Sequence, residues 1–126
     1  MINQDYFNIF AWIWIAVAVV TFISLFFVTA PYGRHTQEKG WGKLIDNRLG
    51  WVLMEIPSFI LILVFSIIGD LSNYALILAS CWLLHYFNRT FIFPLRLRTT
   101  GKKMPLSIVL SAIFFNGINA GMNGYF

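Results

Sequence analysis

A few ionisable side chains inside long apolar stretches are the residues of this sequence best suited to chemistry. Glu55 lies in one such stretch, and His85, Tyr86 and Arg89 lie together in the next. His85 and Tyr86 precede Arg89 by four and three residues, so an α-helix would place these side chains near one another on one face. An ionisable side chain at the centre of a membrane helix costs about 2.5 to 3.5 kcal/mol on insertion scales. Glu55, His85 and Arg89 are therefore expected to have partners or a wet cavity.

The stretches that carry these residues are long enough to cross a lipid bilayer. Of the 126 residues, 59% are apolar and 11% are charged, whereas soluble domains have about 25% charged residues. Apolar runs of about 20 residues match a hydrocarbon core of about 30 Å. The sequence therefore predicts an all-α, polytopic integral membrane protein with a single domain and four transmembrane helices, at about residues 9–30, 49–69, 71–93 and 104–126.

Prolines and basic residues agree with these boundaries. Pro57 is predicted in the first turns of the second helix, and Pro94 and Pro105 are predicted to bracket the loop between the third and fourth. Eight of the nine Lys and Arg residues lie in the loops 31–48 and 94–103. The positive-inside rule places both loops in the cytoplasm and the N-terminus outside. Because the basic residues are juxtamembrane, the net charge of +4 does not indicate a nucleic-acid partner.

Glu55, Tyr86 and Arg89 are predicted to lie at a similar depth. Glu55 is about six residues, or roughly 9 Å, inside the cytoplasmic end of the second helix, and Tyr86 and Arg89 lie about four to seven residues inside the same end of the third. Two interpretations of this polar layer are open. It carries chemistry, or Glu55 and Arg89 are an ion pair that holds two helices together. His85 is interpreted as an orienting hydrogen-bond partner.

The fourth predicted helix carries amides on one face. Asn116, Asn119 and Asn123 are spaced at i, i+3 and i+7, and Gly117 and Gly121 form a GxxxG step. Such small residues allow close helix packing, with Asn side chains as interhelical hydrogen-bond partners. The alternative is that the amides line a ligand cavity.

No metal site is predicted. The two histidines, His35 and His85, and the single cysteine, Cys81, lack the spacing of a metal-ligand set. Cys81 lies in an apolar run and is interpreted as buried packing.

Several strings in the sequence resemble the N-terminal half of the steroid 5α-reductase family, whose members are also called 3-oxo-5α-steroid 4-dehydrogenases. They are PYGR from Pro31, WVLMEIPSF from Trp51, LHYFNRTFIFPLR from Leu84 and the final GYF. The resemblance implies a multi-helix membrane enzyme that reduces a carbon–carbon double bond conjugated to a ketone, with NADPH as hydride donor. Met54 and Asn88 differ from the Gln and His of the animal members, so the sequence is more similar to the plant and bacterial branch.

The resemblance also implies roles for individual residues. Glu55 and Tyr86 would bind the ketone, because a phenol and a protonated carboxyl stabilise the enolate that forms when hydride adds to an enone. Arg89 would orient this pair, and Arg98 would pair with a cofactor phosphate. The remaining candidates for binding or orienting the substrate are His85, Asn116 and Asn119.

Family members are considerably longer than this chain, and the sequence contains no glycine-rich dinucleotide loop. The chain is therefore expected to be an N-terminal portion of the enzyme, or to need a second chain. Its expected partners are membrane lipids and a steroid or other enone lipid, and its expected location is the bacterial inner membrane or the endoplasmic reticulum. The alternative function is a non-catalytic four-helix membrane subunit for binding or assembly.

Overall fold

A computed structural model of the 126-residue chain describes residues 3–29, 42–98 and 100–125. The chain divides into two compact units, one of residues 1–30 and one of residues 31–126. Each unit is described separately below. His35 and most of the first basic loop lie outside the described residues.

The first unit is one helix, α1, from Gln4 to Ser24. It begins at Gln4 rather than at Ile9 because the side chain of Asn3 accepts a hydrogen bond from the backbone N–H of Asp5 at 2.8 Å and caps the helix. After Ser24 the backbone continues in turns as far as Val28. Its apolar side chains are exposed, as expected for a helix that faces lipid or other helices.

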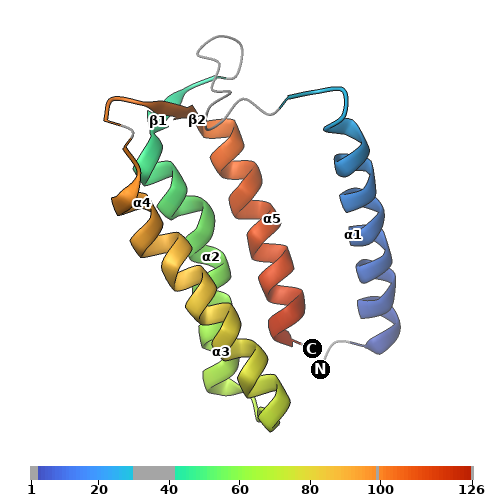
Figure 1. The fold of residues 1–126 in the computed structure, drawn as a ribbon. Helices are drawn as coiled ribbons and strands as arrows, with labels where there is room; N and C mark the ends of the chain where they lie inside the picture. The colour runs from blue at the N-terminus through green and yellow to red at the C-terminus, as the bar shows by residue number, and fades with distance from the viewer. Residues whose placement is uncertain (1–2, 30–41, 99, 126) are drawn as a thin grey trace. The chain divides into compact units, whose positions relative to one another are not determined.

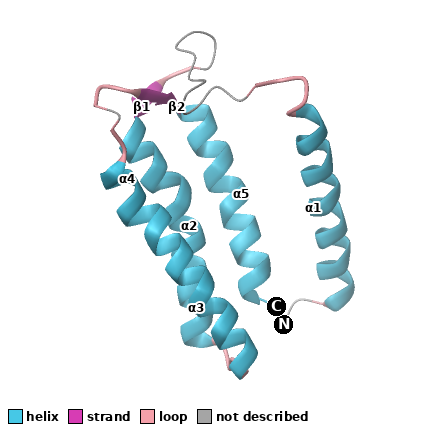
Figure 2. Ribbon diagram, in the orientation of Figure 1, coloured by secondary structure: helices cyan, strands magenta, loops and turns pink. Residues whose placement is uncertain are grey.

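The second unit contains the other helices and a short two-stranded ribbon (Figures 1 and 2). Its elements, in chain order, are β1 (Leu44–Asp46), α2 (Asn47–Ile68), α3 (Asn73–Phe87), the π-helical segment η2 (Asn88–Ile92), α4 (Phe93–Arg96), β2 (Lys103–Pro105) and α5 (Leu106–Tyr125). Helix α2 contacts both α3 and α5. Four helical stretches of the described residues are long and apolar enough to cross a membrane: Gln4–Ser24, Asn47–Ile68, Asn73–Arg96 and Leu106–Tyr125. The prediction of an all-α membrane fold with four spans is confirmed.

The ribbon joins the ends of two loops that are far apart in the sequence. Strands β1 and β2 are antiparallel, with Ile45 opposite Met104. Backbone hydrogen bonds from Asn47 to Lys102 and from Leu106 to the carbonyl of Lys43 extend the pairing to the starts of α2 and α5. Both helices therefore leave the ribbon side by side. The pairing also brings residues from both basic loops to one end of the unit.

The core of the second unit lies beside the ribbon, between α2 and α5. Met54, Met104 and Val109 are buried there, with Met104 fully enclosed. A Cβ atom at Gly50 would collide with the side chain of Met104. Glycine at position 50 is thus what lets β2 approach the first turns of α2 closely.

Pro57 lies inside α2 rather than in its first turns. The helix begins earlier than predicted, at Asn47, because Asp46 caps it by accepting hydrogen bonds from the N–H groups of Arg48 and Leu49. Pro57 therefore removes an interior backbone donor from α2.

Pro94 does not end the third membrane helix. After α3 the chain passes through η2, and Pro94 then occupies the first turn of α4, which ends at Arg96. A proline is tolerated in the first turn of a helix, because a backbone N–H at that position would have no acceptor within the helix. The wider turns of η2 therefore allow the helix to continue past this proline.

A candidate polar site between α2 and α3

Glu55 and Arg89 form an ion pair between α2 and η2. The Nη2 atom of Arg89 lies 2.5 Å from Oε1 of Glu55, whose residue is only 5% exposed. The guanidinium carbon of Arg89 also lies 5.5 Å from the centroid of the Trp51 ring, which adds a cation–π contact. Pairing offsets the cost of placing both charges in an apolar environment. The structure thus brings together two of the residues singled out in the sequence.

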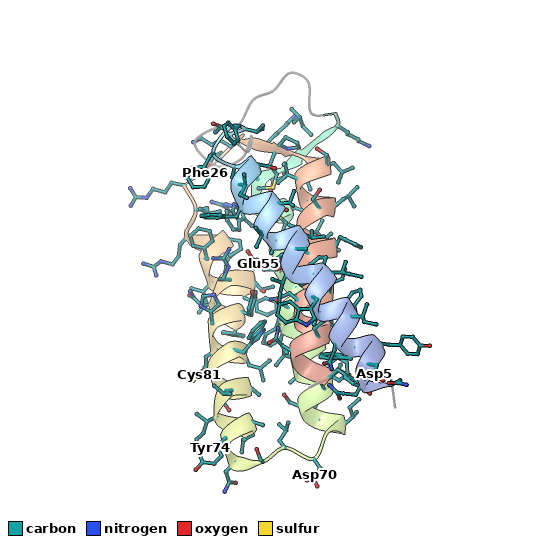
Figure 3. The ribbon with its side chains drawn as sticks, turned by 90° about the vertical axis from the view of Figure 1, so that its right-hand side faces the viewer. Asp5, Phe26, Glu55, Asp70, Tyr74 and Cys81 are labelled. Carbon is teal, nitrogen blue, oxygen red and sulfur yellow. The ribbon has the colours of Figure 1, made fainter. Side chains whose placement is uncertain are left out.

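Figure 3 places Glu55 between the ribbon end of the unit and the turn that carries Asp70. Aromatic side chains surround the ion pair. Trp51 packs edge to face against Phe93, with ring centroids 5.2 Å apart, and Phe59 packs in the same way against Phe91 at 5.5 Å. These rings pack α2 against the end of the third span.

Tyr86 is positioned by aromatic contacts. Its ring stacks on Trp82 at a centroid distance of 5.2 Å and an angle of 24°, and His85 meets it edge to face. Trp82 in turn donates a hydrogen bond from Nε1 to the backbone carbonyl of Ser58 at 3.3 Å. Within the described residues, the Tyr86 hydroxyl makes no hydrogen bond, to Glu55 or to any other group. The ring is therefore held while the hydroxyl stays available to a ligand.

The π-helical segment η2 carries both Arg89 and Thr90. Single π-helical turns inside α-helices are rare and are frequent at functional sites, because the extra residue changes the direction in which side chains point. Here the segment begins two residues after Tyr86 and contacts α2. It therefore sets the relative direction of Tyr86 and Arg89.

Two hydroxyls next to this site lack partners among residues 3–29, 42–98 and 100–125. Ser58 and Thr90 are fully buried, and neither Ser58 Oγ nor Thr90 Oγ1 has a hydrogen-bond partner there. Other hydroxyls in the membrane helices donate to the carbonyl four residues earlier: those of Thr21, Ser24, Ser80 and Ser111. At Ser58 that carbonyl belongs to Met54, and it accepts a hydrogen bond from Asn116 instead. Unpaired buried hydroxyls are rare and indicate a missing partner.

The amides of α5 have different roles. Asn116 donates from Nδ2 to the carbonyl of Met54 at 2.6 Å and so links α5 to α2. Asn123 donates to the backbone carbonyl of Asn119 within its own helix. A Cβ atom at Gly117 or Gly121 would have no atom within 4 Å, apart from the backbone of α5 itself. The GxxxG step is thus not a tight contact between the described helices. Among the described residues, neither Asn116 nor Asn119 makes a hydrogen bond to Glu55.

Comparison with known proteins identifies the family. The chain is 38% identical over 122 residues to steroid 5-alpha-reductase DET2 of Solanum lycopersicum, in an alignment that covers 94% of this chain and 48% of that protein. By sequence, the chain belongs to the steroid 5α-reductase family. It is 40% identical to DET2 of Gossypium hirsutum over 82% of the chain, and 31% identical to 3-oxo-5-alpha-steroid 4-dehydrogenase 1 of Mus musculus over 86%. The chain spans about half the length of these relatives. No protein-family model matches the chain.

The segment from the last residue of α4 to the first residue of β2 is rich in cationic side chains. Arg96, Arg98, Lys102 and Lys103 are all exposed there. The loop is fixed from α2, because Arg48 donates from Nη2 to the carbonyl of Leu97 at 2.8 Å. Cationic side chains on an anchored loop suit a phosphate group. Arg98 lies on this loop, outside the polar layer of Glu55 and Arg89.

Within the described part of the chain, no three His, Cys, Asp or Glu side chains come together as a metal-ligand set. His85 contacts Tyr86 through its ring and makes no hydrogen bond within that part. The predicted hydrogen bond of His85 is thus not made among the described residues, where its ring packs edge to face on Tyr86.

Two residues of the site were not singled out in the sequence. Trp82 lies four residues before Tyr86, and Ser58 lies three residues after Glu55. Helical spacing therefore places each of them beside a residue that the sequence analysis had singled out. What the sequence could not give is that Trp82 bridges the two helices through the carbonyl of Ser58.

Proposed function

We propose that this chain is the ketone-binding part of a membrane-embedded, NADPH-dependent reductase. Its substrate would be an enone lipid such as a 3-oxo-Δ4-steroid, whose conjugated carbon–carbon double bond is reduced. The observation that carries the proposal is the available hydroxyl of Tyr86, one helical turn before Arg89 in a layer that also holds the buried Glu55. The names of the relatives, steroid 5-alpha-reductase and 3-oxo-5-alpha-steroid 4-dehydrogenase, support the substrate class.

The chemistry follows from where charge develops. NADPH, when bound, supplies a hydride to the β-carbon of the enone, and negative charge then grows on the carbonyl oxygen. Tyr86 donates its hydroxyl hydrogen bond to that oxygen, and donors aimed at developing charge are among the largest single contributions to catalysis. Stacking on Trp82 holds the phenol in place before the substrate arrives.

Glu55 has two states in this proposal. In the structure, its Oε1 accepts a hydrogen bond from Arg89, which is the arrangement of an ionised pair. When protonated, Glu55 donates a second hydrogen bond to the ketone, and Arg89 then places its positive charge beside the developing enolate. Arg89 thus positions Glu55 when Glu55 is ionised, and it stabilises the negative charge of the enolate when Glu55 is protonated.

The proposed cofactor contact is Arg98 with a phosphate of NADPH, supported by the exposed, anchored basic loop that carries it. The rest of the cofactor site would come from the part of the family length that this chain does not span, either as a continuation of the chain or as a second polypeptide. His85, Asn116 and Asn119 are proposed to support the substrate site indirectly, through packing and helix contacts.

The proposed setting is a multi-pass protein of the bacterial inner membrane or the endoplasmic reticulum. All 126 residues would form one transmembrane domain. Both basic loops would face the cytoplasm and the N-terminus would face the opposite side, as the positive-inside rule requires. The β-ribbon supports a common side for the two loops, because it pairs their ends.

A non-catalytic membrane subunit is the second candidate, and the Glu55–Arg89 ion pair favours it. A buried pair with an added cation–π contact is also what a purely structural brace between two helices would look like. In that case, the available Tyr86 hydroxyl would have no function.

The test is NADPH-dependent reduction of a 3-oxo-Δ4-steroid in membranes, with the chain alone and with a C-terminal half supplied from a family member. The chain alone should neither bind NADPH tightly nor reduce the steroid, and the complemented chain should do both. Absence of reduction by every complemented form would reject the reductase. Tight, stoichiometric NADPH binding by the chain alone would reject the proposed division of the cofactor site.

A further inference from the structure

The second unit contains a cavity at the end away from the ribbon. Its volume is about 810 Å³, and it is open on one side. It is lined by the second half of α2, the first half of α3, the turn between them and the last turns of α5. Figure 3 shows Cys81, one of its lining residues, between the level of Glu55 and the turn that carries Asp70. Cys81 is exposed, so the prediction that it is buried is wrong. The size falls in the range of about 300 to 1,000 Å³ found for small-molecule sites.

Trp82 connects this cavity to the polar layer. Its side chain lines the cavity and stacks on Tyr86, and its Nε1 atom holds the backbone of Ser58. On α2, Ile62 and Ser66 follow Ser58 at intervals of four residues, and both line the cavity. The faces of α2 and α3 that carry Glu55 and Tyr86 therefore continue into the cavity wall.

The cavity contains hydrogen-bonding groups that the described residues leave unused. Ser66 makes no hydrogen bond within them, although Ser80 and Ser111 donate to the carbonyl four residues earlier. Asn123 uses its Nδ2 on Asn119 and leaves its side-chain oxygen without a hydrogen bond from the described residues. These groups are free to hydrogen-bond to a ligand that brings its own polar atom.

We propose that this cavity binds the end of the substrate opposite the ketone, and that Ser66 and Asn123 select an oxygen at that end. Ser66 follows Glu55 by three helical turns, a rise of about 16 Å. With carbon–carbon bonds of about 1.5 Å, a four-ring nucleus measures roughly 10 Å from its ketone carbon to its far ring. The selected oxygen therefore lies on a side chain, and the substrate class is an enone sterol with an oxygenated side chain.

Selection by hydrogen bonding follows from the solvent that the substrate leaves. A lipid that enters from the bilayer gains little from an apolar wall, because its hydrocarbon was already in an apolar medium. A hydroxyl gains more, since hydrocarbon gives it no partner. The polar groups of the cavity therefore discriminate more strongly than its apolar area does.

This inference rests on the proposed function, because it takes Glu55 and Tyr86 as the ketone end. Its test needs no turnover, since Cys81 is the single cysteine of the sequence and lines the cavity. The 126-residue chain in lipid nanodiscs is alkylated with N-ethylmaleimide, a membrane-permeant reagent, and the rate is followed by mass spectrometry. The probes are 26-hydroxycholest-4-en-3-one and cholest-4-en-3-one, which differ by one side-chain hydroxyl.

The hydroxylated sterol should protect Cys81 at about tenfold lower concentration than its partner, the effect of one hydrogen bond in an apolar medium. Ser66→Ala should abolish this difference. Ser80→Ala is the matched control, because that hydroxyl donates to Leu76 and does not line the cavity, and it should change nothing. Tyr86→Phe should weaken protection by both sterols equally and preserve their difference.

Equal protection by the two sterols, or an unchanged difference in Ser66→Ala, would overturn the inference. Protection by neither sterol would also overturn it and would leave a membrane lipid or another polypeptide as the occupant. The proposed function is judged separately, by steroid reduction in the complemented chain. If the complemented chain reduces the steroid but sterols do not protect Cys81, only the cavity assignment is rejected. If sterols protect Cys81 but the complemented chain does not reduce the steroid, only the reductase function is rejected.

Discussion

Helix α2 meets α5 on one side and α3 with η2 on the other, and the two contacts differ in how their polar groups are used. Towards α5, the contact is built from Met54, Met104 and Val109, closed by glycine at position 50, and Asn116 donates to a backbone carbonyl across it. These groups find their partners inside the chain. Packing within the chain therefore explains the contact between α2 and α5, without a bound ligand.

Towards α3 and η2, the contact is aromatic and charged. It contains the Glu55–Arg89 pair, the available hydroxyl of Tyr86 and the buried hydroxyls of Ser58 and Thr90, which lack partners among the described residues. Ionisable groups are costly inside a membrane, and those that occur there often mark functional sites. Packing therefore accounts for the α5 side in full, whereas the unused polar groups on the α3 side support the proposal that this side carries chemistry.

The largest expected effect is on the α3 side, when the ion pair is broken from one end. Glu55→Leu leaves Arg89 without its carboxylate and should destabilise the second unit by up to about 3 to 5 kcal/mol, with the partial exposure of Arg89 reducing the loss. The double variant Glu55→Leu, Arg89→Leu should recover most of the stability in a denaturation assay. It should recover none of the reductase activity of the complemented chain. Recovery of both would mean that the pair is only a brace.

On the α5 side, overpacking should affect stability and leave the chemistry of folded protein intact. Gly50→Leu places a side chain against the enclosed Met104 and should lower the free energy of unfolding by about 1 to 3 kcal/mol. Gly117→Leu is the control, because the space beside Gly117 is open, and it should change stability by about 0.5 kcal/mol or less. If the control is as damaging as Gly50→Leu, the packing on this side has been misjudged.

A smaller effect is expected at the basic loop, which belongs to neither contact. Arg98→Ala should raise the KM for NADPH in the complemented chain by about tenfold and leave the steroid KM nearly unchanged, because one phosphate contact is lost. NADPH binding measured by fluorescence should weaken by the same factor. Lys103→Ala, at the start of β2, is the comparison that separates a specific contact from a general loss of positive charge. An equal effect of the two substitutions would argue against a specific role for Arg98.

The arrangement of the basic loops in the membrane can be tested without activity. Cysteines introduced singly at Lys43, Lys102 and Ser72, in a Cys81→Ser background, should react with an impermeant thiol reagent from two different sides. The first two should react from the cytoplasmic face and Ser72→Cys from the other, because the ribbon joins the first two positions at one end of the unit. Reaction of Lys43→Cys and Lys102→Cys from opposite faces would contradict the four-span arrangement.

The four membrane helices could be predicted because each is a long apolar run. Hydropathy is calculated from the local sequence alone, without knowing which helices pack together. Counting residues from the helix ends also placed Glu55 and Arg89 at one depth, and the structure pairs them. The β-ribbon could not be predicted, because three-residue strands such as Leu44–Asp46 have no detectable pattern and form only when the two loops meet.

The same limit explains the errors around the prolines. A helix that continues past Pro94 depends on the π-helical register of η2, which tertiary contacts with α2 select and the local sequence does not reveal. Contacts across helices, such as the one from Trp82 to Ser58, likewise depend on how α3 is rotated about its axis. Residue types and spacing identify candidates, and helix orientation decides which of them meet.

Tyr86→Phe in the complemented chain tests most directly whether the α3 side carries chemistry. The substitution removes one hydroxyl, and within the described residues that hydroxyl makes no hydrogen bond, so the free energy of unfolding should change little. Loss of a hydrogen-bond donor to the developing enolate should lower kcat by about 10² or more. Full reductase activity in a stably folded Tyr86→Phe variant would contradict the account and leave the Glu55–Arg89 layer as a structural brace.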